Sequence, residues 1–462
     1  MNAGPFHLKE NNTTVRTEVL AGLTTFLTMA YIIFVQPAVL STDFTGKPTG
    51  LDAGAVLLAT CLVSALATMF MGLYARYPIA LAPGMGENFF FVGVIMALAR
   101  PELGFEQPWR VALGVVFIAG VVFFILSALR VREALIRAVS PSLRNGIAVG
   151  IGLFIAFIGL QNGGLLLKNP NPGGNWVLLN SRLFAGEGAV RKDFLIFLIG
   201  LFIAGGLQVR RVRGAILWGI LASALAALCL GRVGFEQKGV LANVFGLPQI
   251  AQPAAFRMDI RSALSLVCLP FIIVFVFMDL FDTVGTLVGV AEQAGFIRNN
   301  ELPRASRALL VDASATVGGA CMGTSTVTSY IESAAGVAYG GRTGLTSVVT
   351  GALFLLALLF SPLIALIGRH PPITASALVI VGSMMMRNAR KVDWDDYSEG
   401  IPAFLVAMGI PLTYSIADGL AIGFISYPIV KLIGGRGRSV SWLMYALAAI
   451  LLAYFVFVRV HI

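Results

Sequence analysis

Long apolar runs are the feature that most constrains this chain. Hydrophobic stretches of about 20 residues, the length that crosses a bilayer as an α-helix, recur along nearly the whole sequence. Only 12% of the 462 residues are charged, against roughly 25% in an ordinary soluble domain. The runs lack the two-residue alternation of barrel strands. The sequence therefore predicts an all-α polytopic membrane protein with about fourteen transmembrane segments.

A break early in the chain interrupts this pattern. Residues Tyr77 to Gly86 read Y-P-I-A-L-A-P-G-M-G, with too many prolines and glycines for an uninterrupted helix. The apolar segment from Glu87 to Ala99 that follows is too short to cross the bilayer. Irregular backbone is tolerated at membrane depth only inside the protein or along a cavity. We therefore expect an extended piece that enters a buried half-helix.

A second break lies in the other half of the chain. Residues 323–337 read G-T-S-T-V-T-S-Y-I-E-S-A-A-G-V and place one carboxylate, Glu332, among small and hydroxylated residues. Each break is the third element of its half, and paired interrupted segments in corresponding positions point to the binding site of a transporter. We therefore expect broken third and tenth helices beside such a site.

The remaining spans divide the chain into two repeats. An odd number of elements in the first half would start the second half on the opposite side of the membrane, which predicts inverted repeats over 1–231 and 232–462. The other spans are expected at 18–40, 52–74, 110–129, 142–162, 194–209, 214–231, 263–291, 307–322, 344–367, 373–386, 400–434 and 441–459. The stretch 400–434 contains Pro411 and Asp418, so it forms one element or two.

The loops carry the orientation signal. Cations are more frequent in the segments that are cytoplasmic when the N-terminus is inside, among them the arginines at 130, 132, 137, 144, 210, 211 and 213. The polar start of the chain does not have the pattern of a cleavable signal peptide. We expect a multi-pass protein of the cytoplasmic (inner) membrane with a cytoplasmic N-terminus. The net charge of +10 is spread over loops and forms no tract for nucleic acid.

Acids at membrane depth are the main candidates for site residues, because an ionisable residue in a membrane segment is by default a functional-site hypothesis. The candidates are Glu332, Asp279, Asp282 and Glu87. Asp279 and Asp282 are three residues apart and would share a helix face. On helical spacing Glu332 would share its face with Thr328 and Ser329.

These acids suit a flat heterocycle. Two carboxylates from different helices can accept its N–H groups through charge-assisted hydrogen bonds, and any of the four acids can carry a coupling proton. Each acid can instead cap or pin a neighbouring helix, and Glu87, near a helix end, can reach water.

The ends of the half-helices add polar groups. Unpaired N–H groups at a helix N-terminus can bind a polar substrate or steady an acid. We expect such ends at Gly84 and Gly86 in the first half, and at Thr324 and Ser325 in the second.

Several classes of function are disfavoured. No G-x-x-x-x-G-K-[ST] motif occurs, so transport must be secondary rather than ATP-driven. The cysteines lack C-x-x-C spacing and the histidines are far apart, so neither a metal site nor a cofactor is expected. The D-x-x-D of Asp279 and Asp282 leaves an intramembrane Mg²⁺-dependent transferase as an alternative. Such an enzyme would need a second acidic motif and basic residues at the same depth, and the sequence has neither.

Two long motifs resemble those of a known family. D-L-F-D-T-V-G-T-L at 279–287 and the stretch 323–337 are similar to signatures of the AzgA-type purine permeases. These belong to the nucleobase cation symporter superfamily, which includes the uracil and xanthine permeases. P-G-M-G at 83–86 and I-P-L-T-Y-S-I-A-D-G at 410–419 fit as well, and the likeness extends from about Thr17 to Gly435.

The resemblance implies a uracil-permease-like fold of two inverted repeats of seven helices each. The core domain would contain elements within 18–129 and 263–367, and the gate domain elements within 142–231 and 373–459. The implied activity is proton-coupled import of adenine, guanine or hypoxanthine by elevator-like or rocking alternating access. The implied contacts of the base are Glu332, Asp279 or Asp282, Asn88, Ser329 and Thr328.

One departure from the family pattern bears on specificity. Relatives usually read L-N-A-Y/F-F after P-G-M-G, whereas this chain reads E-N-F-F-F at 87–91. Glu87 adds an acid and Phe89 replaces a small residue. The choice of purine and of the coupling ion (H⁺ or Na⁺) therefore stays open. A homodimer is a further possibility that the sequence leaves open. An anion exchanger of the same architecture is the runner-up, and the acids argue against it.

Overall fold

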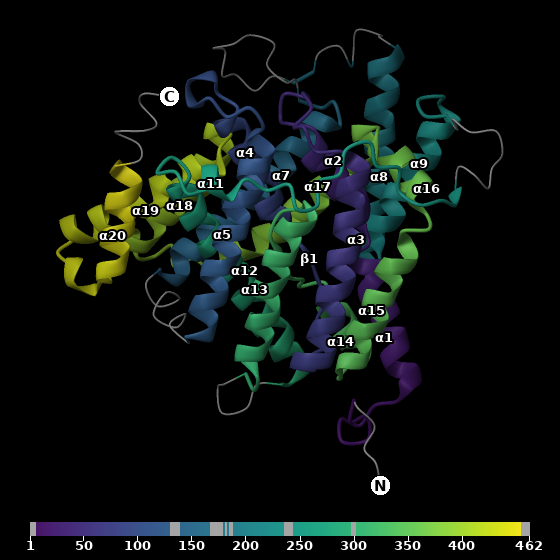
Figure 1. Cartoon of the computed structure of the whole chain (residues 1–462), viewed down its shortest axis with the longest axis horizontal. Helices are drawn as coiled ribbons and strands as arrows, with labels where there is room; N and C mark the ends of the chain where they lie inside the picture. Colours follow the sequence, from purple (N-terminus) through teal and green to yellow (C-terminus); the bar gives the residue numbers. More distant parts are fainter. Residues whose placement is uncertain are drawn as a thin grey trace.

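The computed structural model describes residues 6–129, 139–166, 179, 180, 183, 188–234, 244–296 and 302–453 (Figure 1). Arg130, Arg132 and Arg137, and the end of the last expected span beyond residue 453, lie outside these ranges.

The described chain is helical apart from two short strands. The first half contains α1 (Val15–Met29), α2 (Tyr31–Ser41), α3 (Ala53–Phe70), β1 (Leu81–Pro83), α4 (Met85–Leu98), α5 (Pro108–Ala128), α7 (Pro141–Asn162), α8 (Gly188–Val209) and α9 (Ala215–Cys229). The second half contains α11 (Ile260–Ala263), α12 (Leu269–Ala294), α13 (Ala305–Met322), β2 (Val327–Ser329), α14 (Ser333–Tyr339), α15 (Gly344–Ala357), α16 (Ser361–Gly368), α17 (Pro371–Met385), α18 (Tyr397–Thr413), α19 (Ile416–Ile433) and α20 (Trp442–Ala453). Short π or 3₁₀ turns lie at Met71–Ala75, Pro101–Leu103, Met386–Lys391 and Gly437–Ser439.

The fold is that of a polytopic membrane protein, as the sequence predicts. Within the described ranges six helices are long and apolar enough to cross a membrane, or seven if the bent pair α16 and α17 is one span. Shorter apolar helices are α4, α9, α15 and α20. The count of fourteen segments remains a prediction.

Some expected spans are interrupted. The span expected at 18–40 bends at Ala30, between α1 and α2, and the one expected at 344–367 is split into α15 and α16. Pro362 stands in the first turn of α16, where a missing N–H costs nothing, so a new helix starts there readily. The stretch 400–434 forms two helices, which meet at Tyr414 in a left-handed conformation (φ 57°).

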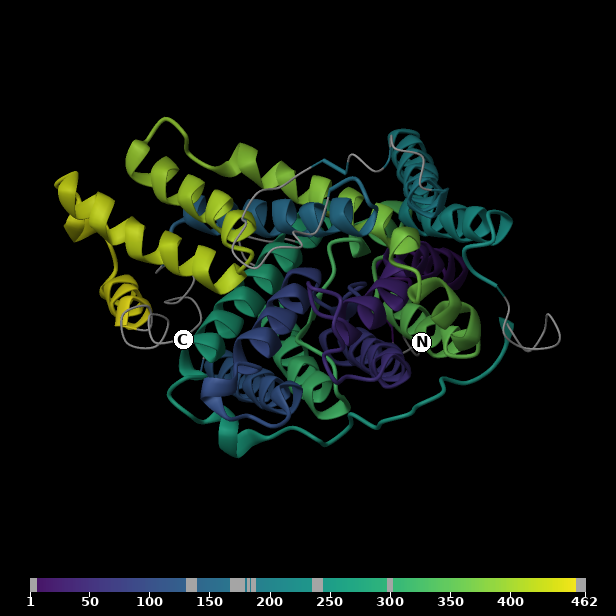
Figure 2. The same cartoon turned by 90° about the horizontal axis from the view of Figure 1, so that it is seen from above.

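Helix contacts group most helices into two sets, which we name after the predicted core and gate domains. The core set is α1 to α5 with α12 to α15, in which α1 packs on α14 and α15, α3 on α13 and α15, and α5 on α12 and α13. The gate set is α7 to α9 with α17 to α20, in which α7 packs on α17 and α18, α8 on α9 and α17, and α18 on α19. Among the contacts between the sets are those of α4 with α7 and α19, and of α2 with α17. In Figure 2 the yellow C-terminal helices lie along one side, whereas the purple N-terminal helices lie among green ones from the second half.

Small residues allow close packing within the gate set. A Cβ atom on Gly146 would lie 2.7 Å from the carbonyl oxygen of Ala403, and one on Gly150 would lie 3.0 Å from the Cα of Ala407. The Gly146-x-x-x-Gly150 motif of α7 therefore brings α7 against the backbone of α18, as such motifs do between membrane helices.

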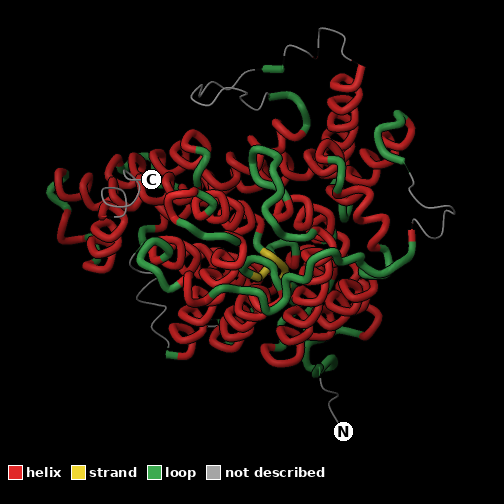
Figure 3. The backbone as a smooth tube through the Cα atoms, turned by 45° about the horizontal axis from the view of Figure 1, so that its top comes forward, coloured by secondary structure: helices red, strands yellow, loops and turns green. Residues whose placement is uncertain are grey.

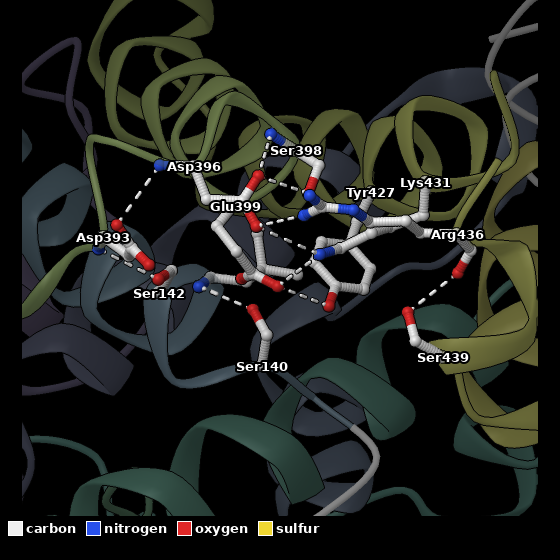
Figure 4. A network of polar contacts seen from close by, with 11 residues as sticks. Ser140, Ser142, Asp393, Asp396, Ser398, Glu399, Tyr427, Lys431, Arg436 and Ser439 are labelled. Carbon is white, nitrogen blue, oxygen red and sulfur yellow. Dashed lines mark hydrogen bonds and ion pairs between the residues drawn. The ribbon is translucent and has the colours of Figure 1, made fainter. Parts of the chain in front are cut away.

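A polar network also joins helices of the gate set (Figure 4). Lys431 of α19 pairs with Glu399 of α18 at 2.8 Å, and Tyr427 donates a hydrogen bond of 2.9 Å to the same carboxylate. Ser142 of α7 accepts a hydrogen bond of 3.1 Å from the backbone N–H of Asp393, just before α18. The start of α7 is thus tied to the α18–α19 hairpin.

The two interrupted elements meet at the centre of the molecule. β1 and β2 form an antiparallel pair in which Ala82 lies opposite Thr328, and the pair is drawn in yellow in Figure 3. The backbone N–H of Gly84 donates to Thr326 at 3.1 Å, and that of Tyr330 donates to Ala80 at 2.9 Å. Backbone N–H and C=O groups that cannot reach water must find partners in the protein. Each broken element therefore supplies hydrogen-bond partners for the backbone of the other. An extended piece entering a half-helix is thus observed in both halves.

Glu18 fixes the element that follows the second half-helix. Its fully buried carboxylate accepts hydrogen bonds from the backbone N–H groups of Arg342, Thr343 and Thr346 at 3.0 to 3.3 Å. The hydroxyl of Thr346 donates a further bond of 2.6 Å. An acid from α1 therefore caps the N-terminus of α15, where the free N–H groups and the helix dipole favour a negative charge.

Candidate functional site

Asp282 and Glu332 face an accessible space beside the strand pair. Asp282 and Gly285 on α12 are exposed, and Glu332, at the start of α14, is half-buried. The two carboxylates lie close enough to interact electrostatically. Next to Glu332, Ile331 extends over the same α12 face, because its Cδ1 lies 3.3 Å from where a Cβ on Gly289 would be. Two acids that the sequence predicts as site residues, Asp282 on α12 and Glu332 at the start of α14, are therefore neighbours.

A tyrosine orients Glu332. The hydroxyl of Tyr31 donates a hydrogen bond of 2.8 Å to Oε1 of Glu332, and Tyr31 is buried. Tyr31 is the first residue of α2, directly after the bend at Ala30. The hydroxyl of Thr28, at the end of α1, lies 3.4 Å from the backbone oxygen of Glu332. The end of α1 and the start of α2 thus both lie against the start of α14.

A second pair of carboxylates lies behind the strands and is buried. Asp279 accepts a hydrogen bond of 2.8 Å from the hydroxyl of Thr316, and its other oxygen has no partner within the described chain. Asp312 accepts bonds from Thr283 at 2.6 Å and from Ser329 at 2.9 Å. This pair joins α12, α13 and β2 and does not face the space at Asp282.

The two aspartates of α12 therefore differ in environment. Residues three apart on a helix differ by about 60° in direction, which is enough here to place Asp279 against α13 and Asp282 in the open space. The two aspartates therefore do not face the same surroundings, although the sequence predicted that they share one helix face.

The helical spacing assumed for Glu332 is wrong, because Thr328 and Ser329 lie in strand β2. Thr328 faces Thr283, with 2.8 Å between the hydroxyl oxygens, and Ser329 faces Asp312. Both residues are buried in the wall behind the open space.

Glu87 and Asn88 begin the other half-helix, α4. Gly84 is the N-cap of α4, as expected, and Glu87 curls back toward it: a Cβ on Gly84 would lie 2.2 Å from Oε2 of Glu87. Glu87 is 2% exposed, so the alternative in which it reaches water is wrong. Gly86 lets α4 approach the gate set, because a Cβ there would lie 3.0 Å from Ile151 of α7.

Asn88 belongs to a closed amide and hydroxyl network. Gln36 of α2 donates to Asn88, Thr324 and Ser325 at 3.0 to 3.2 Å. Asn88 in turn donates to Oε1 of Gln36 and accepts a hydrogen bond from Ser325. Thr324 and Ser325 therefore hold side chains of α2 and α4. They do not cap the second half-helix, which starts at Ser333 with Glu332 as its N-cap, so their expected capping role is wrong.

The elements nearest Asp282 and Glu332 carry no basic side chain of their own, but Arg144 of α7 lies beside α12, with its guanidinium 5.6 Å from the centre of the Phe281 ring. Neither strand has a lysine, arginine or histidine, and α2, α4, α12 and α14 have none. The described residues also contain no cluster of three or more His, Cys, Asp or Glu side chains that could hold a metal ion. The site can thus accept hydrogen bonds from N–H groups and exchange protons, and it would repel an anion.

Three residues of this region were missed by sequence reasoning: Tyr31, Gln36 and Asp312. Each is a polar residue inside an apolar or small-residue-rich span. That position is itself the signal that would have found them, because polar groups at membrane depth need partners.

Comparison with known proteins places the chain in a family. Residues 16–422 match Xan_ur_permease, a permease family, and the chain belongs to that family. A permease of Methanocaldococcus jannaschii is 46% identical over 98% of this chain and 97% of its own length. The guanine/hypoxanthine permease PbuG of Bacillus subtilis is 42% identical over 98% and 99%, and the adenine permease AdeQ of Escherichia coli is 39% identical over 96% and 94%.

Solved structures with little sequence identity share the fold. The transmembrane domain of the cyanobacterial bicarbonate transporter BicA superposes with a TM-score of 0.60, at 14% identity over 88% of this chain and 97% of that one. SLC26A9 superposes with a TM-score of 0.64, at 10% identity over 94% and 68%. Membership of the permease family, rather than the shared fold, makes the chain a membrane transport protein and not an enzyme.

Proposed function

We propose that this protein imports purine nucleobases, namely guanine, hypoxanthine or adenine, together with protons. The names of the B. subtilis and E. coli relatives, each similar over nearly its whole length, support this class of substrate. The shared architecture alone does not, because BicA is a bicarbonate transporter.

The observation that carries the proposal is the placement of Asp282 and Glu332. They come from different elements and border one accessible space, and Tyr31 fixes one oxygen of Glu332. A purine base presents N–H groups along its edge, and two carboxylates on opposite sides can accept them through charge-assisted hydrogen bonds. Asp282 accepts no hydrogen bond from the described chain, so its oxygens are available to a ligand.

The same pair accounts for coupling to protons. Two neighbouring carboxylates repel each other when both are ionised. The elements that bear them, α12 and α14, have no basic side chain of their own. Uptake of one proton by the pair removes the repulsion and neutralises part of the charge that would otherwise cross the membrane with the base.

Transport requires the site to open to each side in turn. The strands, both half-helices and the acids belong to the core set, so we infer that this set moves against the gate set in an elevator-like or rocking motion. The proposed division is core within 18–129 and 263–367, and gate within 142–231 and 373–459. The protein would lie in the cytoplasmic membrane with its N-terminus inside, which fits the distribution of cations.

Anion exchange on the same fold is less well supported. An anion site would need a cation or unopposed dipoles, whereas this space is bordered by two carboxylates. Burying an anion beside them would cost electrostatic energy without compensation.

Uptake into proteoliposomes tests the proposal. With an inward proton gradient, we expect saturable uptake of labelled hypoxanthine, guanine or adenine that a protonophore abolishes. Glu332→Gln should lose uptake, whereas Glu106→Gln, at an exposed loop position, should keep it. Normal uptake by Glu332→Gln would overturn the assignment of the site. Uptake driven by an imposed Na⁺ gradient alone would show that the coupling ion is Na⁺ and not H⁺.

A further inference from the structure

A large cavity lies at the boundary between the core and gate sets, apart from the acids described above. Its volume is about 870 Å³, within the range of small-molecule sites. It lies where α2 ends and α16 meets α17, on the side of the molecule opposite the start of α1 (Figure 1). Its lining includes Thr42, Phe44, Phe89, Asn162 and Thr374. None of the acids of the candidate site lines it, and the charged residues in its lining are Asp43, Asp52 and Arg369.

Phe44 and Phe89, which line this cavity, belong to a cluster of four aromatic rings with Phe154 and Tyr414. Phe44 stacks on Phe89 at 6.1 Å, and both contact the edge or face of Phe154, at 5.4 Å and 6.1 Å. Tyr414 contacts Phe44 at 6.0 Å and Phe154 at 5.5 Å. Phe89 and Phe154 are almost fully buried, at 2% and 0% exposure. We call these four residues the ring barrier.

The ring barrier spans the boundary between the two helix sets. Phe44 follows α2 and Phe89 is on α4, in the core set, whereas Phe154 is on α7 and Tyr414 joins α18 to α19, in the gate set. Tyr414 is held by its φ of 57° and by a hydrogen bond to Gln161 of α7. A motion of one set against the other would therefore separate the rings.

Phe89 also lies on the half-helix whose start adjoins the strand pair. Phe89 is five residues from Gly84, the N-cap of α4, which is roughly 7–8 Å along the helix. At that end of α4 lies the strand pair that bears Thr328 and leads to Glu332. Along α4, Phe89 therefore connects the cavity lining with the strand pair beside the acids.

We propose that this cavity is an outer vestibule that binds the purine base before transport, and that the ring barrier separates it from the acid site. The inference rests on the proposed function for the identity of the ligand. The half-buried ring of Phe44 can pack against a flat base, and the amide of Asn162 and the hydroxyl of Thr374 can meet its polar edge. Phe89, which is almost fully buried behind Phe44, belongs to the barrier.

Cysteine labelling from the outside tests both parts. The background chain carries serine at Cys229 and Cys321, since Cys61 and Cys268 are buried. Thr42→Cys places a thiol in the cavity lining, and Thr45→Cys places one at an exposed position of the same loop outside it. Gly285→Cys reports on the acid site, where a Cβ meets nothing within 4 Å. The reagent is a membrane-impermeant maleimide applied to intact cells.

For the vestibule, we expect saturating hypoxanthine to slow labelling of Thr42→Cys at least threefold without changing that of Thr45→Cys. The protection should persist with Glu332→Gln, because the vestibule lies apart from the acids. If hypoxanthine changed the labelling rate of both thiols equally, or of neither, the proposal that the vestibule binds the base would be overturned.

For the barrier, Gly285→Cys should resist outside reagent in the background chain and become labelled at least tenfold faster with Phe89→Ala. Phe154→Leu provides the same test should Phe89→Ala fail to reach the membrane. An unchanged labelling rate of Gly285→Cys in a folded variant that also carries Phe89→Ala or Phe154→Leu would overturn the proposed role of the ring barrier. Absence of purine uptake by the unaltered protein would refute the proposed function alone, because labelling of Gly285→Cys needs no substrate.

Discussion

The hydroxyl of Tyr31 donates a hydrogen bond of 2.8 Å to Oε1 of Glu332, a residue 301 positions further along the chain. The bond joins the bend between α1 and α2 to the N-terminus of α14. With one oxygen held in this way, the other oxygen of the carboxylate can turn to a ligand. The first span therefore contributes to the site through a side chain that no charge pattern would reveal.

Tyr31→Phe should weaken transport without unfolding the protein. The change removes one hydrogen bond to a carboxylate, worth about 1.5–3 kcal/mol, and leaves the ring packing intact. We expect KM for the purine to rise about tenfold or more, with kcat changed less, in proteoliposome uptake. Tyr397→Phe, at a position 76% exposed, is the control and should behave as the unaltered protein. A Tyr31→Phe variant with unchanged KM would show that the bond does not position Glu332 for substrate.

Much of the fold followed from local sequence. Proline and glycine at 78–86 exclude a continuous helix, and the apolar run after them is too short to span, so the half-helix α4 was predictable. That β1 would pair with β2 was not, because the partners are over 240 residues apart and each strand has only three residues. Strands so short are stabilised by their partner and carry little signal of their own.

The site was predicted in part for similar reasons. Asp282 and Glu332 stood out because charge in an apolar segment is costly. Asp312 sits in a helix rich in alanine and other small residues, and its hydroxyl donors come from α12 and β2. Spacing within one helix could not show those contacts. The same limit applies to Asn88, whose partners lie on α2 and before β2.

Asn88→Ala separates a structural role from a substrate contact. Asn88 is fully buried and bonded to Gln36 and Ser325, so its removal leaves buried polar groups unpaired, at about 1–3 kcal/mol. We expect the melting temperature in detergent to fall by about 2–6 °C, while KM of the surviving protein changes less than threefold. Gln107→Ala, an exposed position, should not change the melting temperature. A normal melting temperature together with a large rise in KM would instead make Asn88 a substrate contact.

Asp312→Ala should destabilise the wall behind the site. The hydroxyls of Thr283 and Ser329 lose their common acceptor inside the protein, at about 1–3 kcal/mol each. We expect a clear fall in melting temperature and in the yield of folded protein. Asp312→Asn keeps an acceptor oxygen and should lose less. Equal effects of Asp312→Ala and of Asp395→Ala, at an exposed loop position, would contradict this role.

The polar network in Figure 4 contributes to the stability of the gate set. Lys431 is only 5% exposed and pairs with Oε1 of Glu399, whereas the buried Oε2 of Glu399 has no hydrogen-bond partner in the described chain. Next to them, the hydroxyl and N–H of Ser398, with Arg436 and Lys431, hold the pKa of Asp396 below its usual range. The stabilisation from Asp396 is therefore present at neutral pH and is lost as the pH falls through that lowered pKa.

Lys431→Met should be more harmful than the loss of an ordinary surface pair. It leaves Glu399 largely buried without its cation, and breaking one side of such a pair costs about 3 kcal/mol. We expect the melting temperature in detergent to fall by several degrees, whereas Lys391→Met, at an exposed position, should have little effect. The double variant Lys431→Met with Glu399→Gln should recover most of the loss, because no unpaired charge remains. A double variant as unstable as Lys431→Met alone would show that the lysine acts by packing on Tyr427, whose ring lies 5.5 Å from Nζ, rather than by its charge.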